Sequence, residues 1–212
     1  GGRFRGIRHS TAHDPDAGIL GAEHTSPNPG LFQEETFRKG FAQLAPLNVS
    51  FDAWFYHPQM PELTDLAQAF PETPIVMDHV GAPLGIGPYK GLRDEIFSQW
   101  SANVTALAKC SNVYVKLGGL AMKLTGFGHH KLDVPPSSEV LAGDWKPYLM
   151  HCIEAFGPER CMFESNFPVD KASCAYTTLW NAFKRLTADF SASDKAALFH
   201  DTATRFYRIE EA

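Results

Sequence analysis

The residue types that can do chemistry stand at the ends of three apolar segments. His79 closes a segment that begins near Thr73, Lys116 lies near the end of a segment from Val113 to Leu117, and Glu164 lies near the end of a third. Short apolar runs bounded by glycine and proline are typical of buried strands. Polar groups at the carboxyl ends of parallel strands meet at one edge of the sheet, where barrels build their active sites. We therefore expect these three side chains to converge on a common cavity.

The three residue types fit the chemistry of an acyl group. An imidazole at His79 can polarise a carbonyl, bind a metal or carry a proton. A buried ammonium at Lys116 is costly without a partner, so it would hold a substrate anion or an oxyanion, or pair with Glu164. A carboxylate at Glu164 is a candidate for deprotonating water, and the competing interpretation is a structural anion paired with Lys116 or an arginine. Asp78 alternates with His79, so we expect it to face the helices or cap a loop.

The apolar periodicity predicts the elements that must position these groups. Strand-like and helix-like segments alternate along the chain, which indicates βαβ units and a parallel sheet of the α/β class. The expected strands are residues 4–9, 49–56, 73–79, 113–117 and 160–165, and the expected helices are residues 34–44, 61–70, 94–109, 138–156, 173–186 and 193–207. Five strands are too few for a closed eight-stranded barrel of about 250 residues. The sheet is therefore either open or the carboxyl part of a barrel.

Composition narrows the class of protein. The 212 residues carry a net charge of −5 and 44% hydrophobic residues, which suits one globular domain without a basic surface for nucleic acid. The longest apolar runs are far shorter than the roughly 20 residues of a membrane helix, so we expect no membrane partner. The four cysteines have no CxxC or zinc-finger spacing, which favours buried thiols and a cytoplasmic location.

Several motifs, in order along the chain, together resemble the amidohydrolase-related family, in the branch of sugar-lactone hydrolases and 2-pyrone-4,6-dicarboxylate lactonase. The matching pieces are Gly6-Ile7-Arg8, Asp78-His79-Val80-Gly81, Val113 to Leu120, Phe156 to Phe163, Ser165-Asn166-Phe167-Pro168 and Thr202 to Arg208. The resemblance implies a (β/α)8 barrel of which this chain supplies about strands 4–8. It thus implies a single barrel domain over residues 1–212 that lacks the amino-terminal strands.

The sequence departs from the family pattern at two places. The HxH pair that the family carries on its first strand is absent, and Asn166 stands where the family commonly has an aspartate that activates water or binds metal. Glu164 replaces a glycine two positions earlier, about 7 Å deeper on the same face of the strand. We expect the carboxylate to have moved back to Glu164. Asp170 is the other candidate for the missing carboxylate, and it could equally cap the next helix.

The resemblance also assigns substrate-binding positions. An arginine near Arg8 would clamp a substrate carboxylate with its guanidinium fork. Tyr56, His57 and Gln59 follow the second strand, and Tyr56 and His57 alternate, so both cannot point inward. Asp170 completes the expected set. Catalysis is expected from His79, Glu164, Asn166 and Lys116.

These observations predict a hydrolase that cleaves a lactone or a related cyclic carbonyl compound with carboxylate-activated water and no cofactor. One alternative is a metal-dependent decarboxylase or hydrolase of the same superfamily, with one divalent metal such as zinc held partly by residues outside this sequence. Another is a truncated barrel without activity. The substrate would be a small lactone or carboxylated ring compound. The exposed edges of a partial barrel also predict a possible homo-oligomer, poor solubility or a missing amino-terminal segment.

Overall fold

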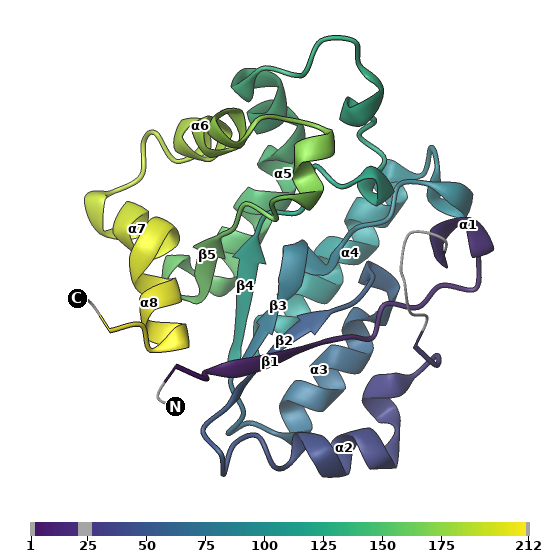
Figure 1. Cartoon of the computed structure of the whole chain (residues 1–212), viewed down its shortest axis with the longest axis vertical. Coiled ribbons are helices and arrows are strands. Elements are labelled where there is room, and N and C mark those ends of the chain that lie inside the picture. Colours follow the sequence, from purple (N-terminus) through teal and green to yellow (C-terminus); the bar gives the residue numbers. More distant parts are fainter. Residues whose placement is uncertain (1–2, 21–26, 211–212) are drawn as a thin grey trace.

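The structure is a computed structural model that describes residues 3–20 and 27–210. Its strands are all parallel and lie side by side in chain order, as Figure 1 shows. They are β1 (Gly6–Ser10), β2 (Ser50–Trp54), β3 (Ile75–Met77), β4 (Val113–Leu117) and β5 (Cys161–Phe163). A doubly wound sheet reverses its strand order at a switch point, whereas a barrel adds each strand beside the last one. The order β1-β2-β3-β4-β5 is therefore that of a barrel segment, as expected.

Helices fill the connections between the strands, and further helices follow β5. They are α1 (Ala17–Leu20), α2 (Glu35–Phe41), α3 (Met60–Ala69), α4 (Arg93–Leu107), α5 (Ser138–Phe156), α6 (Tyr176–Leu186), α7 (Ala192–Ala196) and α8 (Thr202–Tyr207). The side-chain oxygen of Ser137 accepts a hydrogen bond from the backbone N–H of Val140 and so caps α5, the longest of these helices. The short α1 lies in a stretch for which the sequence predicts only a loop.

The two faces of the sheet have opposite character because side chains alternate along each strand. One set packs against the helices in a continuous apolar core, including Phe51, Ile75, Val113 and Phe163. The opposite face, which we call the inner face, carries a mixture of charged and large residues in register. These are Arg8, Asp52, Val76, Tyr114, Lys116 and Met162. Charged groups on a face that a barrel would enclose indicate a site rather than a core.

The carboxyl-terminal segment differs from the single helix predicted over residues 193–207. It consists of α7, a π-helical turn at Ala197–Asp201 and α8. The wider turn carries the chain back to the sheet, where Phe206 packs with Val76 and Met162 and meets the ring of Tyr114 at 4.8 Å. The helix predicted from residue 173 also begins later, at Tyr176, because a 3-10 turn at Val169–Ala172 comes first. Helix α8 thus covers the amino-terminal part of the inner face.

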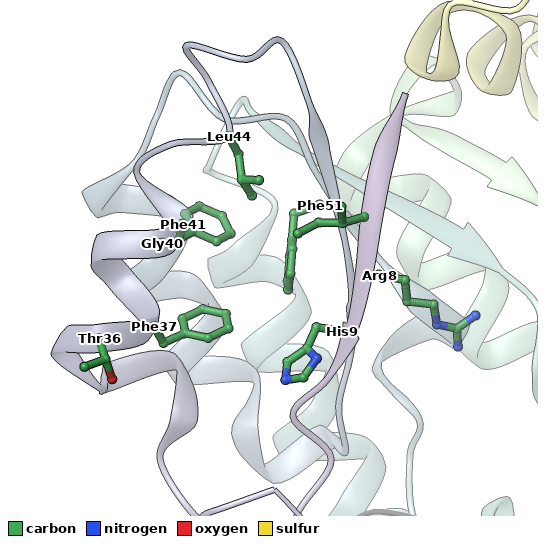
Figure 2. Close-up of a pocket in the computed structure, with 9 residues that line it drawn as sticks. Arg8, His9, Thr36, Phe37, Gly40, Phe41, Leu44 and Phe51 are labelled. Carbon is green, nitrogen blue, oxygen red and sulfur yellow. The ribbon is translucent and has the colours of Figure 1, made fainter. Parts of the chain in front are cut away.

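An apolar hollow of about 380 Å³ lies beside the outer strand β1, on the side that faces α2. Figure 2 shows Phe37, Phe41 and His9 on this side, whereas Arg8 points to the other side of the strand. Arg8 is one of the residues that line the hollow, but its guanidinium points to the opposite side of β1. Within the described residues, β1 and β5 each pair with one neighbouring strand only. The expected homo-oligomer stays a prediction.

Among the described residues, no helix combines the length and the apolar character that crossing a membrane requires. The four cysteines are free thiols, and all are buried.

Candidate functional site

The centre of the inner face is a contact between His79 and Glu164. Glu164 directly follows β5, and its Oε1 accepts two hydrogen bonds from His79, one from the ring Nδ1 and one from the backbone N–H at 3.1 Å. His79 follows β3 in a turn whose residues have positive φ, 53° at His79 and 49° at Val80. A branched residue such as Val80 rarely adopts this conformation, and strain of this kind gathers at functional sites.

Arg8 fixes the proton of the imidazole. Its Nη2 lies 3.0 Å from Nε2 of His79. A guanidinium can only donate hydrogen bonds, so Nε2 must be the acceptor and the ring proton sits on Nδ1. The Nδ1–H then donates to Glu164. The ring also meets Trp54 edge to face at 4.8 Å, and only 3% of the His79 side chain is exposed. Arg8 of β1 and Trp54 of β2 thus fix the orientation of the His79 ring, which follows β3.

A network of ion pairs on the inner face supports the contact between His79 and Glu164. Lys116 Nζ lies 2.6 Å from Asp52 Oδ2 and 2.8 Å from Asp78 Oδ1. The other carboxylate oxygen of Asp78 lies 3.0 Å from Arg8 Nε. Tyr207, from α8, donates a 2.8 Å hydrogen bond to Asp52 Oδ2. The network therefore connects four of the five strands and leads to the guanidinium that contacts His79.

Burial and charge act in opposite directions on these groups. Burial alone raises the pKa of Glu164, but His79 and Lys116 outweigh it, and the net pKa lies below its ordinary value. Burial alone lowers the pKa of Lys116, but Asp78, Tyr207, Asp52 and Glu164 outweigh it and raise it. Glu164 is therefore an anion and Lys116 a cation at neutral pH.

Two consecutive glycines after β4 make room for the pair. A Cβ on Gly118 would lie 2.5 Å from Cγ of Glu164, and a Cβ on Gly119 would lie 2.5 Å from Cβ of His79. Gly119 also has φ +71°, which L side chains rarely adopt. The turn after β4 therefore has to be bare backbone, because both catalytic candidates pack directly on it.

We expect Gly119→Ala to displace His79 and to lower both stability and catalytic activity. The positive φ and the overlap with the His79 side chain should together cost about 2 kcal/mol of unfolding free energy or more. Gly143→Ala is the matched control, since a Cβ there meets nothing within 4 Å in α5. That change should be neutral or stabilise by up to about 1 kcal/mol. Denaturant unfolding of both variants checks this, and equal midpoints would refute the packing argument.

Asn166, which stands in the place of the family's aspartate, lies together with Asp170, one of the two candidates to replace that aspartate. Asn166 adopts φ 51° and its Nδ2 donates a 2.8 Å hydrogen bond to Oδ1 of Asp170. Asp170 is fully buried in the 3-10 turn at Val169–Ala172. Helix α6 has no side-chain cap, and its N-cap position is Ala175, so the alternative that Asp170 caps this helix is wrong.

The three residues Tyr56, His57 and Gln59, which follow β2, pack among the loops after β1, β2 and β3. Oε1 of Gln59 accepts from the backbone of His13 and Tyr56, and its Nε2 donates to Thr11 O. His57 Nδ1 accepts from Leu84 N, and burial lowers the pKa of His57 to about 4 against the opposing charge of Asp14. Tyr56 is buried in an apolar cluster with Trp54. These hydrogen bonds hold Gln59 and His57 against the loops, and substrate-binding roles of Tyr56, His57 and Gln59 stay predictions.

The structure corrects two expectations and adds two residues. Asp78 does not face the helices, because it shares the inner face with Val76. The positive φ at His79 turns the His79 side chain inward as well. Lys116 does not pair with Glu164 but with Asp52 and Asp78. The expectations missed Asp52 and Tyr207. A single acid among the apolar residues of the strand Ser50–Trp54 was a signal for Asp52, whereas the position of Tyr207 depends on the π-helical turn.

The side chains of the site decide whether they could hold a metal ion. No group of three or more His, Cys, Asp or Glu able to hold a metal ion occurs among residues 3–20 and 27–210. Asn166 offers an amide in place of the family's carboxylate, and His79 and Glu164 are directed at each other. The described residues do not by themselves fit a bound metal, and whether the protein works without a cofactor stays a prediction.

Comparison with known proteins gives the family. A sequence profile described as "Amidohydrolase" matches residues 1–209. An uncharacterized protein y4mH of Sinorhizobium fredii is 37% identical over 206 residues, which are 97% of this chain and 61% of that protein. An L-fucono-1,5-lactonase of Burkholderia multivorans is 24% identical over 213 residues, or 100% of this chain and 65% of that protein.

A crystal structure of an amidohydrolase from Burkholderia multivorans with bound HEPES superimposes with a TM-score of 0.78 at 24% identity and covers 97% of this chain and 65% of that chain. A second crystal form contains zinc and superimposes with a TM-score of 0.77. The chain spans less than two thirds of the length of these relatives. The profile match over nearly every residue, together with the barrel-type sheet and its polar inner face, shows that the chain belongs to the amidohydrolase family.

Proposed function

We propose that the protein is a hydrolase that opens a lactone or a related cyclic ester, with Glu164 as the group that activates water. The observation that carries this proposal is the Glu164–His79–Arg8 contact, which joins the residues that follow β5 and β3 to strand β1. Membership of the amidohydrolase family and the lactonase name of two relatives support it. A small lactone or carboxylated ring compound is the substrate class that we infer.

Glu164 is the better proton acceptor of the two groups in contact. Its Oε1 is taken by His79, but Oε2 makes no hydrogen bond to the described residues. Nε2 of His79, by contrast, is covered by Arg8. A water held by Oε2 would give its proton to Glu164 while its oxygen attacks the lactone carbonyl carbon. His79 is then a positioning residue in the resting enzyme rather than the group that polarises the carbonyl.

Arg8 is the group that we assign to the negative charge of the reaction. Its Nε and Nη2 are held by Asp78 and His79, and about half of its side chain is exposed. The remaining N–H groups can meet the carbonyl oxygen as it becomes an oxyanion, or a substrate carboxylate. Lys116 has two carboxylates on its ammonium, so its role is to hold Asp78 and through it Arg8.

The proposal is tested with a panel of aldonolactones, a 2-pyrone carboxylate and a dihydroxybenzoate. Hydrolysis releases an acid, which a pH indicator follows, whereas decarboxylation of the benzoate releases carbon dioxide. We expect turnover of at least one lactone and none of the benzoate. A folded protein that hydrolyses none of the cyclic esters would contradict the proposal, and carbon dioxide release would favour a decarboxylase.

A further inference from the structure

We propose that Asp170 is a second catalytic carboxyl group, which donates a proton to the ring oxygen that leaves when the lactone opens. This inference rests on the proposed function and extends it to the second half of the reaction. Opening the ring generates an alkoxide, which is a poor leaving group unless it is protonated as the bond breaks. Glu164 then holds the proton taken from the water, but none of the contacts described above for Glu164, His79 and Arg8 directs a second proton donor at the ring oxygen.

The geometry around Asp170 sets its two oxygens apart. Oδ1 accepts the amide of Asn166 at 2.8 Å, whereas Oδ2 is buried without a hydrogen-bond partner among the described residues. The backbone is fixed as well: Ser173 N donates to Asp170 O at 3.0 Å, and Ser173 Oγ donates to Ala121 O at 2.6 Å. A fully buried carboxyl oxygen without a partner is costly, which points to a ligand or a proton at that atom.

Asp170 belongs to the same site as the first carboxylate. Asn166, which holds Oδ1, stands two residues after Glu164 at the end of β5. The backbone N–H of Asp170 also donates a 3.2 Å hydrogen bond to the backbone oxygen of Asn166, so the turn folds back onto the segment that carries Glu164. The Ser173–Ala121 hydrogen bond ties this segment to the loop after β4, whose two glycines contact the pair.

The environment favours the protonated form of Asp170. Burial raises the pKa of Asp170 to about 7, and the negative charge of Glu164 acts in the same direction. The amide of Asn166, the imidazole of His79 and the backbone of Ala121 act in the opposite direction. The thiol of Cys174 is the other titratable group against this turn. The pKa values of Glu164 and Asp170 are therefore shifted in opposite directions. Glu164 is ionised and Asp170 is able to carry a proton, as in enzymes that pair a base with an acid.

The proton balance closes with these two groups. Glu164 takes one proton from water, and the resulting hydroxide adds to the carbonyl carbon. The bond from that carbon to the ring oxygen then breaks, and the ring oxygen receives the proton of Asp170. The products are a carboxylic acid and a free hydroxyl on the opened chain. Transfer of the proton from Glu164 back to Asp170 through solvent restores the starting state.

The test compares two lactones that differ in their leaving oxygen. The ring oxygen of glucono-1,5-lactone leaves as an alcohol. The ring oxygen of dihydrocoumarin leaves as a phenol, which needs far less help from an acid. We expect Asp170→Asn to lower kcat/KM by about 100-fold or more for the first lactone and by less than about 10-fold for the second. Asp189→Asn, at an exposed position, is the matched control and should change neither.

The pH profile provides the second readout. A proton donor is present below its pKa, so kcat/KM of the unchanged protein for the aliphatic lactone should fall as the pH rises through about 7. Asp170→Asn should remove this fall, which is the alkaline limb of the pH profile. Asn166→Ala removes a donor that stabilises the carboxylate anion, so it should move the limb to higher pH. This second variant decides the question if Asp170→Asn does not fold.

The outcomes separate the two proposals. If the unchanged protein hydrolyses neither of these lactones nor any other cyclic ester of the panel, the proposed function fails. If it hydrolyses both, but Asp170→Asn loses the same factor on each and the limb stays in place in Asn166→Ala, the lactonase stands and the role of Asp170 is refuted.

Discussion

Replacing Glu164 by glutamine is expected to lower kcat/KM for the lactone by about 1,000-fold and to leave the fold intact. Glutamine keeps the shape of the side chain and can still accept the Nδ1–H and N–H of His79 through its amide oxygen. It cannot accept a proton from water. The loss should therefore appear mainly in kcat, because substrate contacts through Arg8 remain in place.

The matched control for this change is Glu154→Gln, at an exposed position of α5, which should keep full activity. The pH dependence identifies the base. Because the pKa of Glu164 lies below its ordinary value of 4.5, the basic form persists into acid, and kcat/KM should stay high down to that region. A fall centred near 6.5, the ordinary pKa of histidine, would transfer the role to His79. Full turnover in Glu164→Gln would eliminate the carboxylate mechanism.

Replacing Lys116 by methionine is expected to lower the free energy of unfolding by about 3 kcal/mol. Methionine preserves the apolar stem but leaves Asp52 and Asp78 without their shared cation, at side chains that are 14% and 0% exposed. Breaking a buried pair costs more than the pair itself contributes, because an unpaired charge stays inside. Activity should fall as well, since Asp78 also holds Arg8.

Two further variants make this result interpretable. Lys146→Met, at an exposed position of α5, should change the unfolding free energy by no more than about 0.5 kcal/mol. Adding Asp52→Asn to Lys116→Met should recover part of the loss, because it removes one of the stranded charges. Urea denaturation measures all three. A loss below about 1 kcal/mol for Lys116→Met would show that the ion pairs do not form inside the protein.

Periodicity predicts the five strands of this fold but not every helix. Each strand overlaps its predicted segment, and only β1 extends one residue beyond it, because runs such as residues 113–117 are apolar on one face and stop at glycines. Of the three residues expected to converge on a common cavity, His79 and Glu164 are in direct contact, and Lys116 is connected to them through Asp78 and Arg8. The shared cavity itself stays a prediction. Strand polarity places these groups at one edge of the sheet, and a positive φ turns His79 inward.

Pairing between distant residues was not predictable in the same way. Lys116 could pair with any acid of the inner face, and only the register of β2, β3 and β4 decides for Asp52 and Asp78. Asp78 continues the alternation of Val76 on the inner face, whereas the inward direction of His79 depends on positive φ angles at His79 and Val80, which no propensity indicates. Tyr207 reaches Asp52 across 155 residues of sequence, through a helix whose path bends at a π-helical turn.

The most direct measurement is a kinetic double-mutant cycle on Glu164 and His79. Glu164→Gln, His79→Asn and the double variant are compared by kcat/KM for one lactone. Asparagine is chosen because it tolerates the positive φ of position 79. If the two side chains act as one unit, the double variant should be no slower than the slower single variant. If the two losses multiply instead, the residues act independently, and the account of a His79-positioned carboxylate base is contradicted.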